Sequence, residues 1–114
     1  MQLSAARRYE FRMHRTLSVG TGDLRLEAYT RLTAEGDLEV EQHVVSSTDE
    51  PLSLECLLYA PDRKRLRSFV RVREGEDVRI YRLPNGAELI GKSLWLRAEE
   101  QHGDRVFNVR FIAR

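Results

Sequence analysis

Three histidines and one cysteine are the side chains that could bind a metal or attack a substrate. None of them stands in an HxH, HExxH or CxxC spacing, so the sequence shows no set of converging zinc ligands. His14 and His43 occupy outward positions of two expected strands, and His102 lies in a Gly-Asp turn; we expect each to be solvated. Cys56 has the inward parity of its strand, where an apolar setting raises the pKa of the thiol and makes it unreactive. The sequence therefore predicts no metal and no cofactor.

Hydroxyl, glycine and carboxylate patterns also lack the spacing of a catalytic site. The serines form no GxSxG nucleophile motif. Residues 20–22 have the glycine spacing of a phosphate loop, but no Lys-Ser/Thr and no helix follow them. The carboxylate pairs Glu39/Glu41 and Glu99/Glu100 are common on solvated strands, and no cleft is evident that would raise a pKa. We expect a protein that is not an enzyme.

The elements that must position any surface site are strands. Apolar and polar residues alternate with a period of two, and no segment combines helix-capping signals with an apolar stripe. About eight such runs follow one another at a spacing typical of antiparallel sandwiches and barrels. Their apolar members lie within residues 9–13, 24–32, 38–44, 52–58, 66–72, 78–80, 94–98 and 107–111. The sequence predicts an all-β fold, an Ig-like antiparallel β-sandwich of about seven to nine strands with Greek-key or meander connections.

Two glycine-containing loops are expected to be three-residue hairpin turns. Residues 34–36 end in a glycine that suits the left-handed position, and this register places both flanking apolar sets on one face. Residues 84–86 carry Pro, Asn and Gly and fit the same loop type. The expected strand pairs are Leu32 with Leu38, Arg31 with Glu39, Ile80 with Ile90, Tyr81 with Leu89 and Arg82 with Glu88. The connection over residues 46–51 is similar to the crossing loop of Ig-like bacterial modules, a likeness of fold only.

Charge is segregated along the chain although the net charge is only +1. Residues 32–62 contain eight acids and no Lys or Arg, whereas residues 63–114 contain thirteen bases and seven acids. Acidic and basic strands could lie side by side and neutralise each other, or the surface could be bipolar with a basic face for a partner. Seventeen of the nineteen bases are Arg. We attribute this bias to a GC-rich coding sequence and expect a bacterial source.

Strand parity indicates one candidate binding face. If the even-numbered residues of the strands at 66–72, 78–82 and 94–98 face the core, the odd-numbered residues face outward and form a face over residues 65–73, 79–83 and 93–97. The outward set combines arginines with three aromatic residues: Arg65, Arg67, Phe69, Arg71, Arg73, Arg79, Tyr81, Trp95 and Arg97. Exposed aromatic clusters usually mark a contact surface. Two alternatives stay open: a bulge near Gly91 could turn Trp95 inward, and acids on the rim (Glu74, Glu76 and Glu99) could neutralise the arginines.

These residues suggest a non-catalytic binding or assembly module. We expect Arg67, Arg71, Arg73 and Arg97 to recognise charge, with Phe69, Tyr81 and Trp95 as apolar anchors in contact with a protein partner, a neighbouring domain or a second copy. The alternative is a carbohydrate-binding module that stacks sugar rings on the same aromatics. Single-stranded nucleic acid fits less well, because nucleic-acid domains are usually basic overall. An uncovered Glu39/Glu41 strand could also dock head-to-tail on the arginine face of another copy.

The length sets the domain organisation. A chain of 114 residues can bury one core but not two, so we expect residues 1–114 to be a single domain, whole or a module of a larger protein. No apolar run approaches the roughly 18 residues of a membrane-spanning helix. Residues 1–8 lack the apolar segment of a signal peptide. We expect a soluble chain, and the sequence leaves its compartment open.

Overall fold

A computed structural model of the chain describes residues 11–19 and 22–114. These residues form eight strands and one short 3-10 helix, η1. They contain no helix that is long and apolar enough to cross a membrane. The elements are β1 (Phe11–Val19), β2 (Gly22–Leu32), β3 (Leu38–Ser46), β4 (Leu52–Tyr59), β5 (Leu66–Val72), β6 (Gly75–Leu83), η1 (Gly86–Leu89), β7 (Ser93–Glu100) and β8 (Val106–Ile112).

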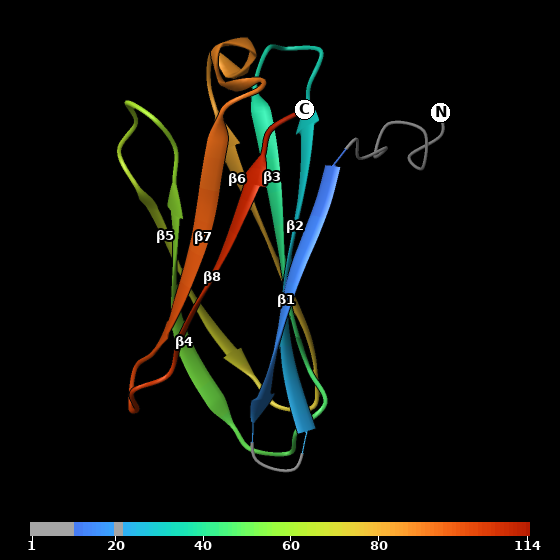
Figure 1. Cartoon of the computed structure of the whole chain (residues 1–114), viewed down its shortest axis with the longest axis vertical. Helices are drawn as coiled ribbons and strands as arrows, with labels where there is room; N and C mark the ends of the chain where they lie inside the picture. The colour runs from blue at the N-terminus through green and yellow to red at the C-terminus, as the bar shows by residue number, and fades with distance from the viewer. Residues whose placement is uncertain (1–10, 20–21) are drawn as a thin grey trace.

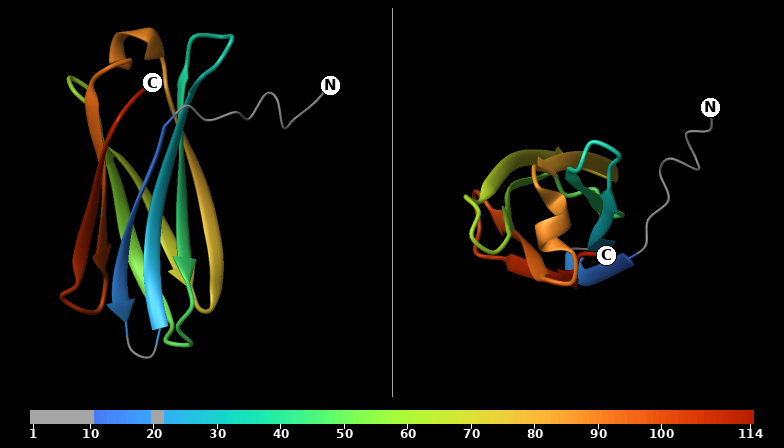
Figure 2. Two further views of the ribbon diagram at one scale, coloured as in Figure 1. Left: turned by 45° about the vertical axis from the view of Figure 1, so that its right-hand side comes forward. Right: turned by 90° about the horizontal axis from the view of Figure 1, so that it is seen from above.

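The strands form two four-stranded antiparallel sheets. Their orders are β1-β2-β3-β6 and β5-β4-β7-β8 (Figure 1). The chain passes from one sheet to the other after β3, after β5 and after β6. Seen from above, the strands of both sheets surround one interior (Figure 2). The expected all-β antiparallel fold is confirmed.

The interior is filled by the apolar members of the alternating runs. Because successive side chains of a strand point to opposite faces, β2, β4, β7 and β8 each contribute alternate residues to the core. Cys56 lies among these buried residues as the parity predicts, and burial raises the pKa of its thiol to about 12. Each fully buried leucine contributes roughly 1.5–3 kcal/mol. The largest fully buried apolar side chains are Leu24, Leu26, Leu38, Val40, Leu54, Leu58, Leu89, Leu94, Leu96 and Phe111.

The β2–β3 hairpin has the predicted register. Leu32 pairs with Leu38 and Arg31 pairs with Glu39. Gly36 has a φ of 92°, in the left-handed region that glycine enters without a steric cost. The turn is closed by backbone hydrogen bonds between Thr33 and the residues at 36–37. This part of the expected turn chemistry is confirmed.

The hairpin predicted at residues 84–86 is wrong. Residues 86–89 form η1, and the left-handed residue is Asn85, with a φ of 55°, instead of Gly86. Gly86 packs directly on the β2–β3 turn and donates its N–H to the carbonyl oxygen of Gly36 at 2.7 Å. β6 therefore does not fold back on residues 88–90 but hydrogen-bonds to β3. The observed pairs are Ile80 with Glu41, Tyr81 with Val40, and Arg82 with Glu39.

An ion-pair network links the β7–β8 hairpin to the β3–β4 connection. The Arg105 guanidinium donates to Glu100 at 2.7 and 2.9 Å and to Glu50 at 2.8 Å. The backbone N–H of Arg105 also donates to Glu100. These hydrogen bonds hold the pKa of the Glu100 carboxyl below its usual value of 4.5.

This pKa shift predicts an acid-sensitive contribution to stability. Because the folded state lowers the pKa of Glu100, its stabilisation is fully present above about pH 4.5 and is lost as the pH falls through the folded-state pKa. Free energies of unfolding, measured by urea titration between pH 7 and pH 3, should show a deficit for Glu100→Gln that shrinks towards acid pH. Glu35→Gln, in the exposed β2–β3 turn, is the matched control. If the free energies of unfolding of the wild type and Glu100→Gln change in parallel with pH, Glu100 does not have a lowered pKa in the folded state.

Candidate functional site

The outer face of the β5-β4-β7-β8 sheet gathers the arginine and aromatic side chains. The register aligns Tyr59, Trp95 and Arg110 in one row across β4, β7 and β8. The next row contains Arg67, Leu57, Arg97 and Asn108. We call this surface the arginine–aromatic face; its outward residues are Ser53, Glu55, Leu57, Tyr59, Arg67, Phe69, Arg71, Trp95, Arg97, Glu99, Asn108 and Arg110.

Trp95 is the centre of a stacked group on this face. Its chain neighbours Leu94 and Leu96 are fully buried, so the indole points away from the core and is partly exposed. The Tyr59 ring lies 4.9 Å from the Trp95 ring, tilted by 31°. The Arg110 guanidinium carbon lies 5.0 Å from the Trp95 ring centroid, within cation–π range. The open alternative of an inward Trp95 does not apply.

The arginines of the face differ in whether they have a carboxylate partner. Arg67 pairs with Glu55 at 2.8 Å, and Arg97 pairs with Glu99 at 2.6 Å. The hydrogen bond that Arg97 donates to Glu99 raises the pKa of the Arg97 guanidinium. Arg71 and Arg110 form no ion pair with any carboxylate in the described part of the chain, and neither does Arg73, just beyond β5. The face therefore keeps guanidinium groups free for a ligand.

Phe69 gives the face its most exposed aromatic side chain. It stands on the edge strand β5, opposite Glu55, and is 52% exposed. Burial of this ring by a partner would remove a large apolar area from water. Of the nine predicted face residues, seven come from β5, its two ends and β7: Arg65, Arg67, Phe69, Arg71, Arg73, Trp95 and Arg97.

Arg79 and Tyr81 do not belong to this face, which corrects the prediction. Both lie on β6, in the other sheet. Tyr81 points into the interior, is 7% exposed and donates its hydroxyl hydrogen to Oε1 of Gln42 at 3.0 Å. Its hydroxyl oxygen also lies 2.7 Å from Oγ of Ser68, and burial raises its pKa to about 12. Arg79 is exposed but bound to Asp77 at 2.8 and 3.2 Å.

The physical reason is the pairing of β6 with β3. Val40 and Gln42 are buried on β3, and their partners Tyr81 and Arg79 therefore share the core side of β6, where Tyr81 is covered and Arg79 stays exposed on this edge strand. The even-numbered residues Val78 and Ile80 are left outside, 44% and 43% exposed. The parity assumed for residues 78–82 is therefore wrong.

Among the residues of the face that were not predicted as site residues, three lie next to Trp95: Tyr59, Asn108 and Arg110. The alternation of buried Phe107, Val109 and Phe111 already places Asn108 and Arg110 outward. Their position beside Trp95 depends on the pairing of β7 with β8, which no local pattern specifies.

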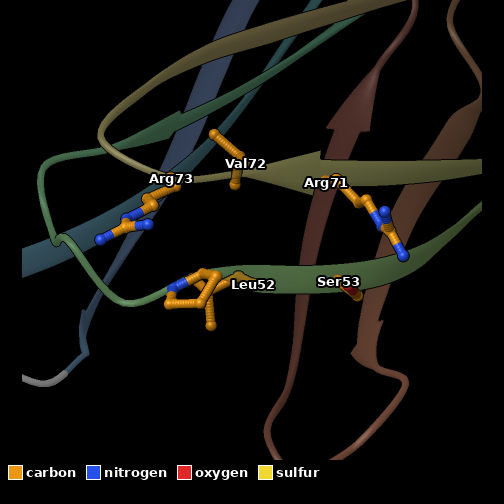
Figure 3. A pocket seen from close by; sticks show the side chains of 6 residues that line it. Leu52, Ser53, Arg71, Val72 and Arg73 are labelled. Carbon is orange, nitrogen blue, oxygen red and sulfur yellow. The ribbon is translucent and has the colours of Figure 1, made fainter.

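Two depressions mark this side of the molecule. One, of about 250 Å³, is lined by Trp95, Arg97, Asn108 and Arg110. The other, of about 350 Å³, lies where β4 begins and β5 ends, and the Arg71 side chain extends there from β5 towards β4 (Figure 3). Its lining residues are Pro51, Leu52, Ser53, Arg71, Val72 and Arg73. Both depressions combine arginines with an apolar wall.

The acidic strand β3 is neutralised within the molecule. Glu39 is 7% exposed and lies between Arg31 at 3.0 Å and Arg82 at 3.2 Å, on the two neighbouring strands. Side-by-side acidic and basic strands therefore account for this part of the charge segregation. The expectation of solvated carboxylates at Glu39 and Glu41 is wrong, since both are buried. The condition for head-to-tail docking, an uncovered acidic strand, is not met.

His43 is not a free surface histidine either, which corrects that expectation. Its Nε2 lies 2.7 Å from Glu41, and its Nδ1 lies 2.6 Å from Glu76 on β6. The Tyr29 ring packs edge-on against the His43 imidazole, with the two ring centroids 5.0 Å apart. These contacts join β3 to β6. His102 is exposed in its turn, and the side chain of His14 lies outside the described residues.

Within residues 11–19 and 22–114, no three His, Cys, Asp or Glu side chains are placed to hold a metal ion. Comparisons with known protein families, curated proteins and solved structures found no match to this chain.

Proposed function

We propose that this chain is a non-catalytic binding module whose arginine–aromatic face contacts another protein or a neighbouring domain. The observation that carries the proposal is the row of Tyr59, Trp95 and Arg110, on the same face as the exposed Phe69 and as Arg71, whose guanidinium has no carboxylate partner among the described residues. Trp, Tyr and Arg are the residues that dominate the energy of protein interfaces. The row stands on hydrogen-bonded strands, so little ordering is needed on binding.

The charge pattern favours a protein over a polyanion. Glu55 and Glu99 stand among the arginines of the face. A nucleic-acid backbone would bring phosphates against these carboxylates at regular intervals, whereas a protein surface can place acidic and neutral groups to match.

The stacking pattern also favours a protein over a sugar. A glycan ring would stack on a bare aromatic face, but Arg110 lies over one side of Trp95 and Tyr59 packs beside it. The exposed Phe69 lacks a polar group that could orient a sugar hydroxyl. Carbohydrate binding therefore needs a rearrangement that protein binding does not.

We further propose that the two sheets form an Ig-like sandwich. β5 and β6 lie side by side at the edges of the two sheets, and β7 returns to pair with β4. The spatial order β6-β5-β4-β7 has the form of a Greek key. Without β1, seven strands divide as β2-β3-β6 and β5-β4-β7-β8, and seven is the strand number of a constant-type Ig domain.

A charge-reversal comparison tests the binding proposal. The chain, immobilised through a biotin tag, is used to capture proteins from an extract of its source, and the bound proteins are identified by mass spectrometry. Arg71→Glu/Arg110→Glu should reduce capture of the partner at least tenfold, because both guanidinium groups lack an internal carboxylate. Lys64→Glu/Lys92→Glu makes the same charge change at two exposed residues off the face and should retain the partner.

Two results would contradict the proposal. Equal capture by wild type and both variants would show that the face does not bind the partner. An oligosaccharide panel that raises the melting temperature of the wild type, but not of the face variant, would assign the face to a glycan.

A further inference from the structure

The depression beside Trp95 is lined almost entirely by hydrogen-bond donors. Two guanidinium groups, Arg97 and Arg110, and the amide of the exposed Asn108 face a space of about 250 Å³ next to the indole. The same space has no carboxylate among its described lining residues. A group that enters it must supply acceptors, and a negative charge would be favoured by both arginines.

The donors of this depression are only partly used inside the molecule. Arg97 binds Glu99 through its Nε at 2.6 Å, and not through its terminal nitrogens. Arg110 contacts the Trp95 ring and no described carboxylate. Guanidinium forks bind planar carboxylates with two parallel hydrogen bonds, so two partly free forks and an amide match one carboxylate well.

We propose that this depression is a carboxylate-binding subsite that receives an Asp or Glu side chain of an acidic partner protein. The proposal rests on the proposed function and specifies the chemistry of the partner. The Trp95 ring forms one wall, and a desolvated carboxylate beside it would interact more strongly with Arg97 and Arg110 than it would in open water.

The charge of the whole face argues for an acidic partner instead of a second copy. The strands of this sheet present four outward arginines and two glutamates, and both glutamates are already paired. A two-fold contact would bring this positive face against itself, which is repulsive. The depression at Arg71 and Arg73 likewise lacks a described carboxylate and offers a place for a second acidic side chain.

An NMR titration with a carboxylate probe tests the subsite. Acetylated tetra-glutamate is added at low ionic strength to the isotope-labelled chain. The indole N–H of Trp95, the only tryptophan, and the side-chain amide of Asn108 report on the depression. We expect saturable shifts of both signals and at least roughly tenfold weaker binding to Arg110→Gln, because one charge-assisted hydrogen-bond donor is lost. Lys92→Gln removes one exposed charge off the face and should bind as the wild type does.

The other outcomes overturn the subsite. Absence of shifts at Trp95 and Asn108, or equal shifts in Arg110→Gln, would exclude a carboxylate site there. Tighter binding of oligo-thymidylate or of a sulfated oligosaccharide at the same signals would reassign it to a phosphate or sulfate ligand. If the titration shows no binding but the face still captures a partner, the carboxylate subsite is rejected and the proposed binding function is retained. If neither the peptide titration nor the partner capture depends on the face variants, the binding face itself is rejected.

Discussion

Replacing Gly86 with alanine is expected to lower the free energy of unfolding by about 3 kcal/mol, the upper end of the range for overpacking. A Cβ at this position would overlap the backbone nitrogen of Leu38 and lie 2.8 Å from its Cα. Backbone cannot give way as a flexible side chain can, so η1 must separate from the β2–β3 turn. The hydrogen bond from Gly86 to Gly36 would then weaken as well. Chemical denaturation monitored by circular dichroism measures the loss.

Gly91 provides the matched control for this substitution. It has a φ of 85°, and a Cβ there would meet no atom within 4 Å. Gly91→Ala therefore carries only the left-handed backbone cost of about 1 kcal/mol. Equal losses for the two variants would show that close packing of η1 on the turn is not what Gly86 provides.

Tyr81→Phe is expected to lower the free energy of unfolding by about 2 kcal/mol although the aromatic ring is kept. The hydroxyl is the hydrogen-bond donor to Oε1 of Gln42, a residue with no exposed surface. Its loss leaves this oxygen unpaired between the sheets, where water cannot replace the donor. Ser68 on β5 loses the same partner, so the contact between β5 and β6 weakens too.

Tyr59→Phe is the control for this prediction. Tyr59 packs on Trp95 at the surface, where water can hydrogen-bond to its hydroxyl. Removal of this hydroxyl should therefore change the free energy of unfolding by no more than about 0.5 kcal/mol. Adding Gln42→Leu to Tyr81→Phe should cost less than the sum of the single changes, because both members of the pair are then removed. Equal effects of Tyr59→Phe and Tyr81→Phe would place the Tyr81 hydroxyl in solvent and reject the buried pair.

The stacked row on the arginine–aromatic face shows how far sequence reasoning reaches. Alternation within one strand was enough to place Trp95 and Arg97 outward on β7, and Arg67 and Phe69 outward on β5. It could not place Arg110 over Trp95, because that contact depends on which strands pair and in which register. A pair of strands is a non-local choice, and each strand is compatible with several neighbours.

Residues 78–83 show the opposite case, in which the local pattern is ambiguous. Val78 and Ile80 form one apolar set, and Tyr81 and Leu83 form the other, so the sequence supports either orientation. Pairing with β3 selects the second set for the interior, where Tyr81 can reach Gln42. The larger ring and Leu83 are thereby buried, and Val78 and Ile80 are left at the surface.

By itself the sequence determined the strand content, the β2–β3 turn and the inward position of Cys56, because a period of two and a left-handed glycine are local steric properties. Only the tertiary structure decided the order of the strands. That order moved Tyr81 and Arg79 off the arginine–aromatic face, brought Arg110 onto it and covered Glu39 with Arg31 and Arg82. The physical reason is that the hydrogen bonds between strands and the burial of one shared core must form together across the two sheets, and no single segment can satisfy either requirement alone.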